Sequence, residues 1–572
     1  MQIIKRLSLV LIFIFPFFVS AQISYLPEGS KEYDFLDRLE IKLGQNNNIN
    51  FSTVKPYSRK SIVKETELID SLGSHDADSL SEHEITKWES LNLSKIDKDN
   101  IHSILMNSPE WVSGSKESFL SKKPVLKNFY VTKPNLLEVN TKDFFLALNP
   151  VIYYSMSKES TNDENIFINK RGVTARGIIA NRIGFYTTMS DNQERGPLFF
   201  QNRVKEFDAV PGVGFYKSFK NTAVDLFDAR GYITFNITKY IDVQFGYDKN
   251  FIGNGYRSLF LSDNSNSYLF LKLNTKIWKF NYENIFMQLI PESRNTADTL
   301  LDRKYMALHH LSMNVTRWLN LGLFESITFA RRQYFDFEYL NPIIFLRYVE
   351  GDIGSPDKAN VGLDFKANFA HHFQAYGQFL LDEFIASEIV KNNGYWANKY
   401  GYQLGVKYVD AFQVQNLDLQ VESDRLRPFT FQHNDNYSNY THYNQPLADP
   451  LGANFQEYIG ILKYQPRPKW YINARAIYYF QGLDSARQNF GSNPLELYTT
   501  RTRDYGYYVG SGDKARCLNA SLRLSYELKE NLFIEASYLY RKYAVAQGPG
   551  AGTTSMFGLG IRWNAAIREY DY

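Results

Sequence analysis

Residues 232–273 read YITFNITKYIDVQFGYDKNFIGNGYRSLFLSDNSNSYLFLKL, and this stretch sets the pattern for most of the chain. Apolar and polar residues alternate over 233–238 and again over 241–248, with a turn near Lys239 between the two runs. Side chains of a strand point to opposite faces with a period of two, so each run predicts a strand with one apolar and one polar face. A loop rich in Gly, Asn, Ser and Asp follows, and alternation then resumes as a third strand.

The composition favours a membrane barrel over a secreted globular protein. Aromatic residues make up 16% of the chain, charged residues 22%, and the mean hydropathy is -0.37. This combination is typical of transmembrane β-barrels, which are apolar outside, polar inside and ringed by aromatic residues. A net charge of +3 is too small to indicate a nucleic-acid partner. The single cysteine, Cys517, excludes an internal disulfide framework.

The first 21 residues have the features of a secretory signal peptide. Lys5 and Arg6 precede an apolar run over 7–18, and small residues follow up to an expected cut after Ala21. The alternative is a membrane-anchoring helix, but the run is short for a bilayer span. Beyond it the sequence has no stretch of about eighteen apolar residues, so we expect no helical membrane span.

Residues 22–140 predict a small helical periplasmic region and linker. Leu36, Leu39 and Leu43 fall on one helical face, and Ser81 with Glu84 has the spacing of a capping box. The alternative is a loosely ordered periplasmic extension.

Residues 141–572 predict an all-β, antiparallel transmembrane barrel of about eighteen strands. The clearest strand covers 515–528, where Arg523 and Glu527 lie opposite an unbroken apolar face. The second strand is predicted over 171–181. Tight turns alternate with long polar loops, which places the tight turns on the periplasmic side and the long loops outside or over the lumen. The last predicted strand, 554–565, together with the aromatic Tyr572, is typical of the assembly signal of such barrels.

Several motifs resemble the capsule-assembly Wzi family of outer-membrane proteins and are similar to the gliding-motility protein RemB. The motifs are KEYDFLDRLEIK (31–42), KPYSRKSI (55–62), GYDKNFIGNGYRSLFLSDNSNSYLFLKL (246–273), YLNPIIFLRYVEGD (339–352), VGLDFKANF (361–369), YGQFLLDEF (376–384) and THYNQPLADPLGANFQEYIG (441–460). The resemblance implies an outer-membrane barrel that acts in the attachment of surface polysaccharide or in gliding-related adhesion. The chain departs from the family at 251–255, where FIGNG replaces a Trp-Gly-Pro-Gly type of turn.

Two polar loops supply the residue types that bind sugars, aromatic faces beside planar hydrogen-bonding groups. The predicted ligand-binding residues are Asp248, Asn250, Tyr256, Arg257, Asp263 and Asn264 in one loop and His433, Asp435, Tyr440, His442 and Tyr443 in the other. The alternative is that these residues are solvated loop positions and interfacial aromatics.

Other patterns do not indicate catalysis, a metal or a cofactor. The pairs 309–310 and 371–372 are adjacent histidines, which point to opposite faces of a strand and cannot chelate one ion unless they lie in a turn. The glycine-rich runs 253–255 and 548–552 lack the strand-to-helix context of a phosphate-binding loop.

We therefore expect a non-enzymatic barrel without cofactors in the cell outer membrane. Its expected partners are outer-membrane lipid, surface polysaccharide and other envelope proteins. The alternatives are a porin for small solutes, which needs an open lumen, and a barrel-embedded hydrolase, which needs a nucleophile with a partnered base.

Overall fold

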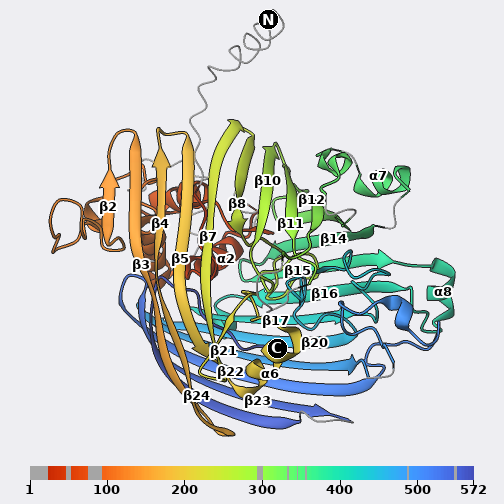
Figure 1. Cartoon of the computed structure of the whole chain (residues 1–572). Helices are drawn as coiled ribbons and strands as arrows, with labels where there is room; N and C mark the ends of the chain where they lie inside the picture. The colour runs from red at the N-terminus through yellow and green to blue at the C-terminus, as the bar shows by residue number, and fades with distance from the viewer. Residues whose placement is uncertain are drawn as a thin grey trace, which may run out of the picture.

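The computed structural model is a closed antiparallel barrel of eighteen strands (Figure 1). It describes residues 24–46, 53–74, 93–292, 300–330, 334–343, 345–354, 357–485, 488–546 and 551–572. The strands of the ring are β3 (Phe144–Glu159), β4 (Asn162–Ile179), β5 (Ile183–Arg195), β7 (Ala223–Thr238), β8 (Ile241–Asp248), β10 (Tyr268–Ile277), β11 (Phe280–Leu289), β12 (Lys304–Asn314), β13 (Leu319–Phe329), β14 (Lys358–Phe369), β15 (Phe373–Glu383), β16 (Lys399–Tyr408), β17 (Leu417–Leu426), β20 (Phe455–Arg467), β21 (Trp470–Leu483), β22 (Asp513–Lys529), β23 (Leu532–Val545) and β24 (Gly552–Trp563).

Each of these strands pairs with the next one along the chain, and β24 closes the ring on β3. Two short strands, β2 (Leu137–Asn140) and β6 (Lys217–Phe219), extend the sheet beside β3 and β7. The predicted fold class is confirmed. We call the side with connections such as that at Lys239 the tight-turn end and the opposite side the long-loop end.

The start of the second strand was predicted wrongly. The second strand was expected to begin at 171, but β4 begins at Asn162 and follows β3 after a two-residue turn. The sequence NDENIFINK (162–170) has no regular alternation. It is nevertheless a strand because β3 and β5 both pair with it.

The wall has the two faces that the alternation predicted. In β22, Leu518, Leu522 and Leu524 are exposed on the outside of the barrel, whereas Asn519 and Ser525 are buried inside. An apolar outer face and a polar inner face are what a barrel in lipid requires.

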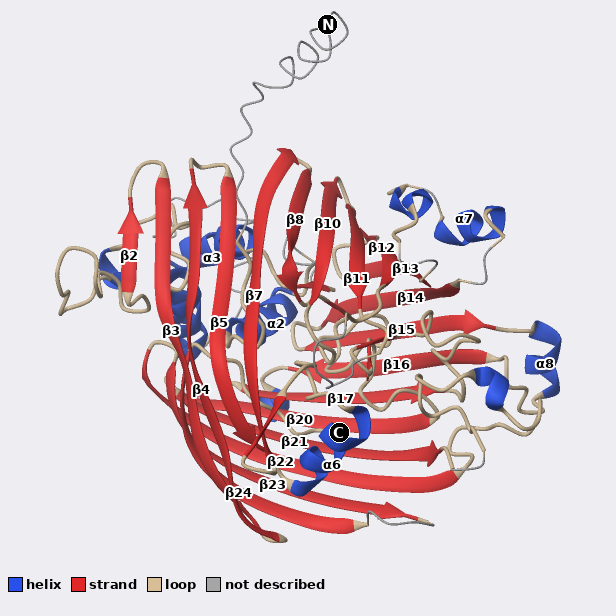
Figure 2. Cartoon of the chain, viewed as in Figure 1, coloured by secondary structure: helices blue, strands red, loops and turns tan. Residues whose placement is uncertain are grey.

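Helices from the described N-terminal residues occupy the tight-turn end of the lumen, where Figure 2 labels α2 and α3. They are α2 (Glu32–Leu43), α3 (Arg59–Ser74) and α5 (Lys95–Met106), and with the described residues from 24 to 113 around them we call them the plug. Leu36, Leu39 and Leu43 share one buried cluster, as predicted. The predicted signal peptide and the Ser81–Glu84 capping box lie outside the described residues. No helix in the described ranges is long and apolar enough to cross a membrane.

Buried ion pairs fix the plug to the turns and the inner wall. The Arg38 guanidinium contacts Asp97 on α5, at 2.7 Å, and Asp410 and Asp418 beside a tight turn, each at 2.5 Å. Lys31 contacts Glu527 and Glu530 at the tight turn between β22 and β23, each at 2.6 Å. The helical region is therefore an integral part of the barrel interior.

We expect Arg38→Ala to weaken docking of the plug by about 3 kcal/mol, because it leaves buried carboxylates short of a cation. Lys42 still contacts Asp97 and Asp410, which keeps the cost at the lower end of the range. Hydrogen exchange of the purified protein should show faster exchange in α2 and α5 and unchanged exchange in the strands. Asp34→Asn is the matched control, since its ion pair with Lys463 is half-exposed and worth about 1 kcal/mol or less. Equal protection of α2 in both variants would contradict this role for Arg38.

Candidate functional site

The loop after β8 folds into the lumen and meets the plug there. Its residues Phe251–Ile252 form β9, which pairs with β1 (Val54–Lys55) of the plug. The Gly253 amide donates to the Thr53 carbonyl at 2.7 Å. We call residues 249–267 the inward loop. The loop was predicted to be either external or lumen-closing, and the structure shows that it crosses the lumen.

Apolar packing against the wall holds the inward loop in place. Leu259, Phe260 and Leu261 are fully buried, and the Phe260 ring stacks on Phe324 of β13 with centroids 4.3 Å apart. A Cβ at position 362 of β14 would lie 2.4 Å from the Phe260 ring, so this close approach requires Gly362. Burying these side chains supplies the driving force that turns the loop inward.

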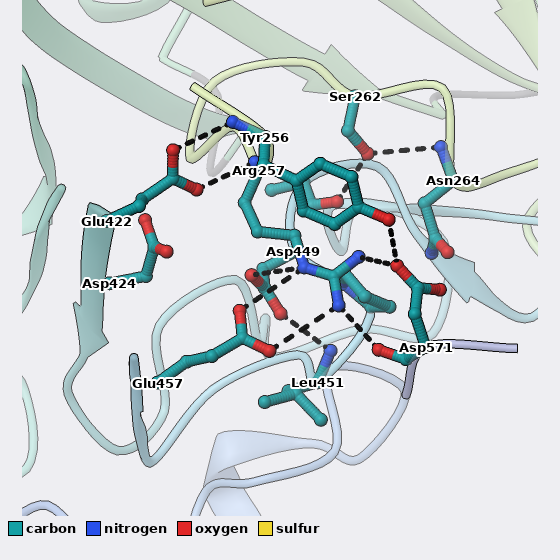
Figure 3. A network of polar contacts seen from close by, with 12 residues as sticks. Tyr256, Arg257, Ser262, Asn264, Glu422, Asp424, Asp449, Leu451, Glu457 and Asp571 are labelled. Atoms are coloured by element: carbon teal, nitrogen blue, oxygen red, sulfur yellow. Dashed lines mark hydrogen bonds and ion pairs between the residues drawn. The ribbon is translucent and has the colours of Figure 1, made fainter. Parts of the chain in front are cut away.

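Arg257 connects the inward loop to four other parts of the chain (Figure 3). Its guanidinium donates to Glu457 of β20 at 3.2 Å and to Asp571 at 3.0 Å, and Asp449 lies 3.9 Å away. The backbone amides of Tyr256 and Arg257 both donate to the Glu422 carboxylate of β17, at 2.7 and 2.8 Å. Arg257 is 8% exposed, so these are buried, charge-assisted contacts.

Residues 564–572, which we call the C-terminal segment, turn back into the lumen after β24. Glu569 contacts Arg475 and Arg523 of the wall at 2.7 and 2.8 Å. Arg568 contacts Glu194 at 2.9 Å. Tyr572 is buried in the lumen, where it shares an apolar cluster with Phe200 and Tyr570.

A cavity of about 620 Å³ lies between the plug, the inward loop and the C-terminal segment. Tyrosines and charged groups of both signs line it, among them Tyr25, Glu28, Tyr33, Lys55, Tyr186, Arg230, Lys249, Lys407, Arg475 and Glu569. Basic and acidic groups lie together along this lining, as in the Glu569 pairs with Arg475 and Arg523. The cavity can therefore offer hydrogen bonds and aromatic faces to a neutral polar ligand. Because its acidic and basic groups balance, it has no strong electrostatic potential that would select a charged ligand.

Nearby cations keep two buried carboxylates of the lumen in their ionised form. Burial would raise the pKa of Asp571, but the charges of Arg257 and Arg475 outweigh it and lower the pKa to about 2. Burial would also raise the pKa of Glu28, and the charges of Lys249 and Arg230 lower it to about 2. Both carboxylates are ionised at neutral pH.

The structure brings one predicted group of ligand residues to the cavity. Asp248, Asn250, Tyr256, Arg257, Asp263 and Asn264 all line it. Tyr256 and Arg257 already donate hydrogen bonds to Glu422, Asp571 and neighbouring groups. These two residues therefore hold the loop in place.

The second predicted group lies in the loop 427–454, away from the cavity lining. Tyr440 is 1% exposed and donates to the Phe260 carbonyl at 2.6 Å. His442 accepts from the Ile290 amide at 2.9 Å, and burial lowers its pKa to about 3. His433 and Asp435 pair with each other at 2.7 Å, and Tyr443 packs on Gly214. These contacts brace the loop.

Sequence reasoning missed an aromatic surface at the long-loop end. Trp396, Phe429 and Tyr507 form its buried base, and Tyr395, Phe490 and Tyr498 pack around them. The Arg501 guanidinium lies 3.8 Å from the Trp396 ring centroid and donates to Asp504 at 2.9 Å. Tyr505 and Tyr508 are about half exposed beside them. We call this group the outer aromatic cluster, and the run YTTRTRDYGYYVG (498–510) was the signal that could have revealed it.

His309 and His310 point to opposite faces of β12, as the strand period predicted, whereas His371 and His372 lie in the turn between β14 and β15. His309 Nδ1 is 2.9 Å from Glu325 on the outer face of the wall, and His310 Nε2 is 2.7 Å from Asp364 on the inner face. Among the described residues, no three His, Cys, Asp or Glu side chains are grouped so that they could hold a metal ion.

Comparison with solved structures identifies the fold as that of bacterial outer-membrane β-barrels. The chain is similar to Wzi of Escherichia coli, described as an outer-membrane protein involved in group 1 capsule assembly and a carbohydrate-binding barrel. The TM-score is 0.55 at 11% identity, over 95% of this chain and all of that one. OprD of Pseudomonas aeruginosa matches with a TM-score of 0.41 at 12% identity, over 78% of this chain and 97% of its own. No protein-family profile and no curated protein sequence matches the chain.

We expect the C-terminal segment to stay docked at pH 4 and to be released as the pH falls through about 2. Asp571 has a depressed pKa, so its contribution is complete above its ordinary pKa near 4 and is lost on protonation. Pepsin cleavage of the segment, relative to a free peptide of the same sequence, should rise steeply across this range. Asp571→Asn should weaken the pH dependence without abolishing it, because the charges of Arg475 and Arg523 also lower the pKa of Glu569 in the same segment. Constant protection of the unaltered protein from pH 4 to below pH 2 would contradict the assignment.

Proposed function

We propose that this chain is a non-enzymatic outer-membrane barrel that binds or organises surface polysaccharide at its long-loop end. The observation that carries the proposal is the outer aromatic cluster. Exposed tyrosine rings stand there beside a guanidinium and a carboxylate, on loops that face the cell exterior if the tight turns are periplasmic.

The chemistry of the cluster suits a glycan. Sugar rings present apolar C–H faces that pack on aromatic rings, and their hydroxyls pair with planar charged groups. Arg501 is held by Trp396 and Asp504, so its planar face and remaining donors are positioned in advance. Preorganised groups lose less entropy on binding. Adhesion during gliding, the second role that the sequence suggested, would use the same surface.

The filled lumen supports an anchoring role more than a channel role. The plug, the inward loop and the C-terminal segment meet inside the barrel, whereas a porin for small solutes needs an open path. In this proposal the barrel is anchored in membrane lipid and positions the outer loops. The plug offers a surface to other envelope proteins at the tight-turn end.

We expect the double variant Tyr505→Ala, Tyr508→Ala to bind surface polysaccharide of the producing cell about tenfold more weakly than the unaltered protein. Loss of exposed aromatic contacts from a binding surface costs on the order of 1–2 kcal/mol. The assay is binding of purified barrel to immobilised polysaccharide. Trp278→Ala is the matched control, because Trp278 is 76% exposed in a tight turn at the other end.

Equal binding by the double variant and the control would contradict the proposed surface. A loss of binding in both variants would also count against it, since it would trace the effect to the barrel as a whole. In cells, deletion of the chain should reduce retained polysaccharide or alter spreading.

A further inference from the structure

The loop between β13 and β14 lies against the outside of the barrel wall, where α7 (Leu346–Asp352) is drawn in Figure 1. We call residues 334–343 and 345–354 the outer strap. Its inner side buries Tyr339, Leu346 and Val349. These side chains pack with Phe286 and Phe329, which belong to β11 and β13.

The wall beneath the strap is part of the outward, apolar face. Phe245, Leu271, Phe286, Ala307 and Ile327 lie opposite one another in register across five neighbouring strands, so they share that face. Phe245 is 47% exposed, whereas Phe286 is 6% and Ile327 1% exposed. Along this row the strap covers wall that would otherwise meet lipid.

The strap also seals polar groups on the lipid side of the wall. Asn284, His309 and Glu325 are all buried on the outward face. Asn284 donates to the Pro342 carbonyl at 3.1 Å, and the Leu346 amide donates to Glu325 at 3.0 Å. A bare carboxylate and imidazole facing hydrocarbon would be costly, so these bonds fix the strap over them.

The opposite side of the strap is exposed and rich in large apolar and aromatic side chains, with the charged Glu338, Arg347 and Asp352 also exposed along the strap. The large side chains are Tyr334, Phe337, Ile343, Phe345 and Tyr348, which are 74%, 78%, 86%, 56% and 65% exposed. An apolar patch of this kind on a protein surface marks a contact with a partner or a membrane.

We propose that the outer face of the strap is immersed in the outer leaflet of the membrane, with lipid as its occupant. The patch is continuous with bare lipid-facing wall: Leu323, the outward residue next to Glu325 on β13, is 55% exposed, and its partner Leu363 is 54% exposed. The mixture of Phe and Tyr matches the aromatic girdle that such barrels place at the membrane interface. The strap thus widens the membrane-contacting surface on one side of the barrel. This proposal does not depend on the polysaccharide-binding proposal.

The test uses spin labels on the strap of the full chain in lipid vesicles. Cys517, which is buried, is first replaced by Ser, and Phe337→Cys and Ile343→Cys are labelled singly. Leu323→Cys on the bare wall is the lipid reference, and Tyr505→Cys in the outer aromatic cluster is the water reference. Electron paramagnetic resonance then measures collisions with oxygen, which concentrates in lipid, and with a water-soluble nickel chelate. All four label sites are exposed in the folded barrel, and heat-modifiable gel migration confirms folding.

Both strap sites should resemble position 323, with at least a threefold higher ratio of oxygen to nickel accessibility than position 505. Strap sites that resemble position 505 would place the strap in water and overturn the proposal. Strap sites shielded from both reagents would mean that a protein surface covers them, which would overturn it as well.

Discussion

The pairing of β1 with β9 inside the barrel is the contact on which the rest of the interior depends. It joins a strand of the plug, which enters from the tight-turn end, to a loop that enters from the long-loop end. Strand pairing satisfies backbone groups that would otherwise be unpaired away from bulk water. Because the inward loop is held at this point, Arg257 lies where wall carboxylates and the C-terminal segment can reach it.

Ion pairs between arginines and carboxylates then determine which segments of the chain occupy the wide lumen. A barrel of sixteen to eighteen strands encloses an aqueous channel unless other parts of the chain occupy it. Here Arg38 and Arg257 each gather several carboxylates from separate segments, one at the plug and one in the centre. Buried pairs of this kind add little net stability, but loss of one partner is costly, so they act mainly to define which segments fit together.

The sequence predicted the wall much better than its contents. Period-two alternation identified all eighteen strands, because a wall strand is recognised from its own residues and pairs only with its two neighbours in the sheet. The start of β4 was missed since residues 162–170 lack that pattern. The inward fold of the 249–267 loop could not be predicted, because its partner Val54 lies about two hundred residues earlier. Local composition did find the cavity-lining residues of that loop. It did not find the outer aromatic cluster, in which Trp396 and Arg501 come from different loops.

The measurement that tests the closed lumen most directly is the ionic conductance of the purified full chain in planar lipid bilayers. The structure predicts no steady conductance at moderate voltage, because the plug, the inward loop and the C-terminal segment meet across the lumen. A variant in which a short Gly-Ser linker replaces residues 251–261 should show intermittent openings, since it lacks β9 and the packing on Phe324. Steady, ohmic conductance of the unaltered chain at the level of an open porin would contradict the account.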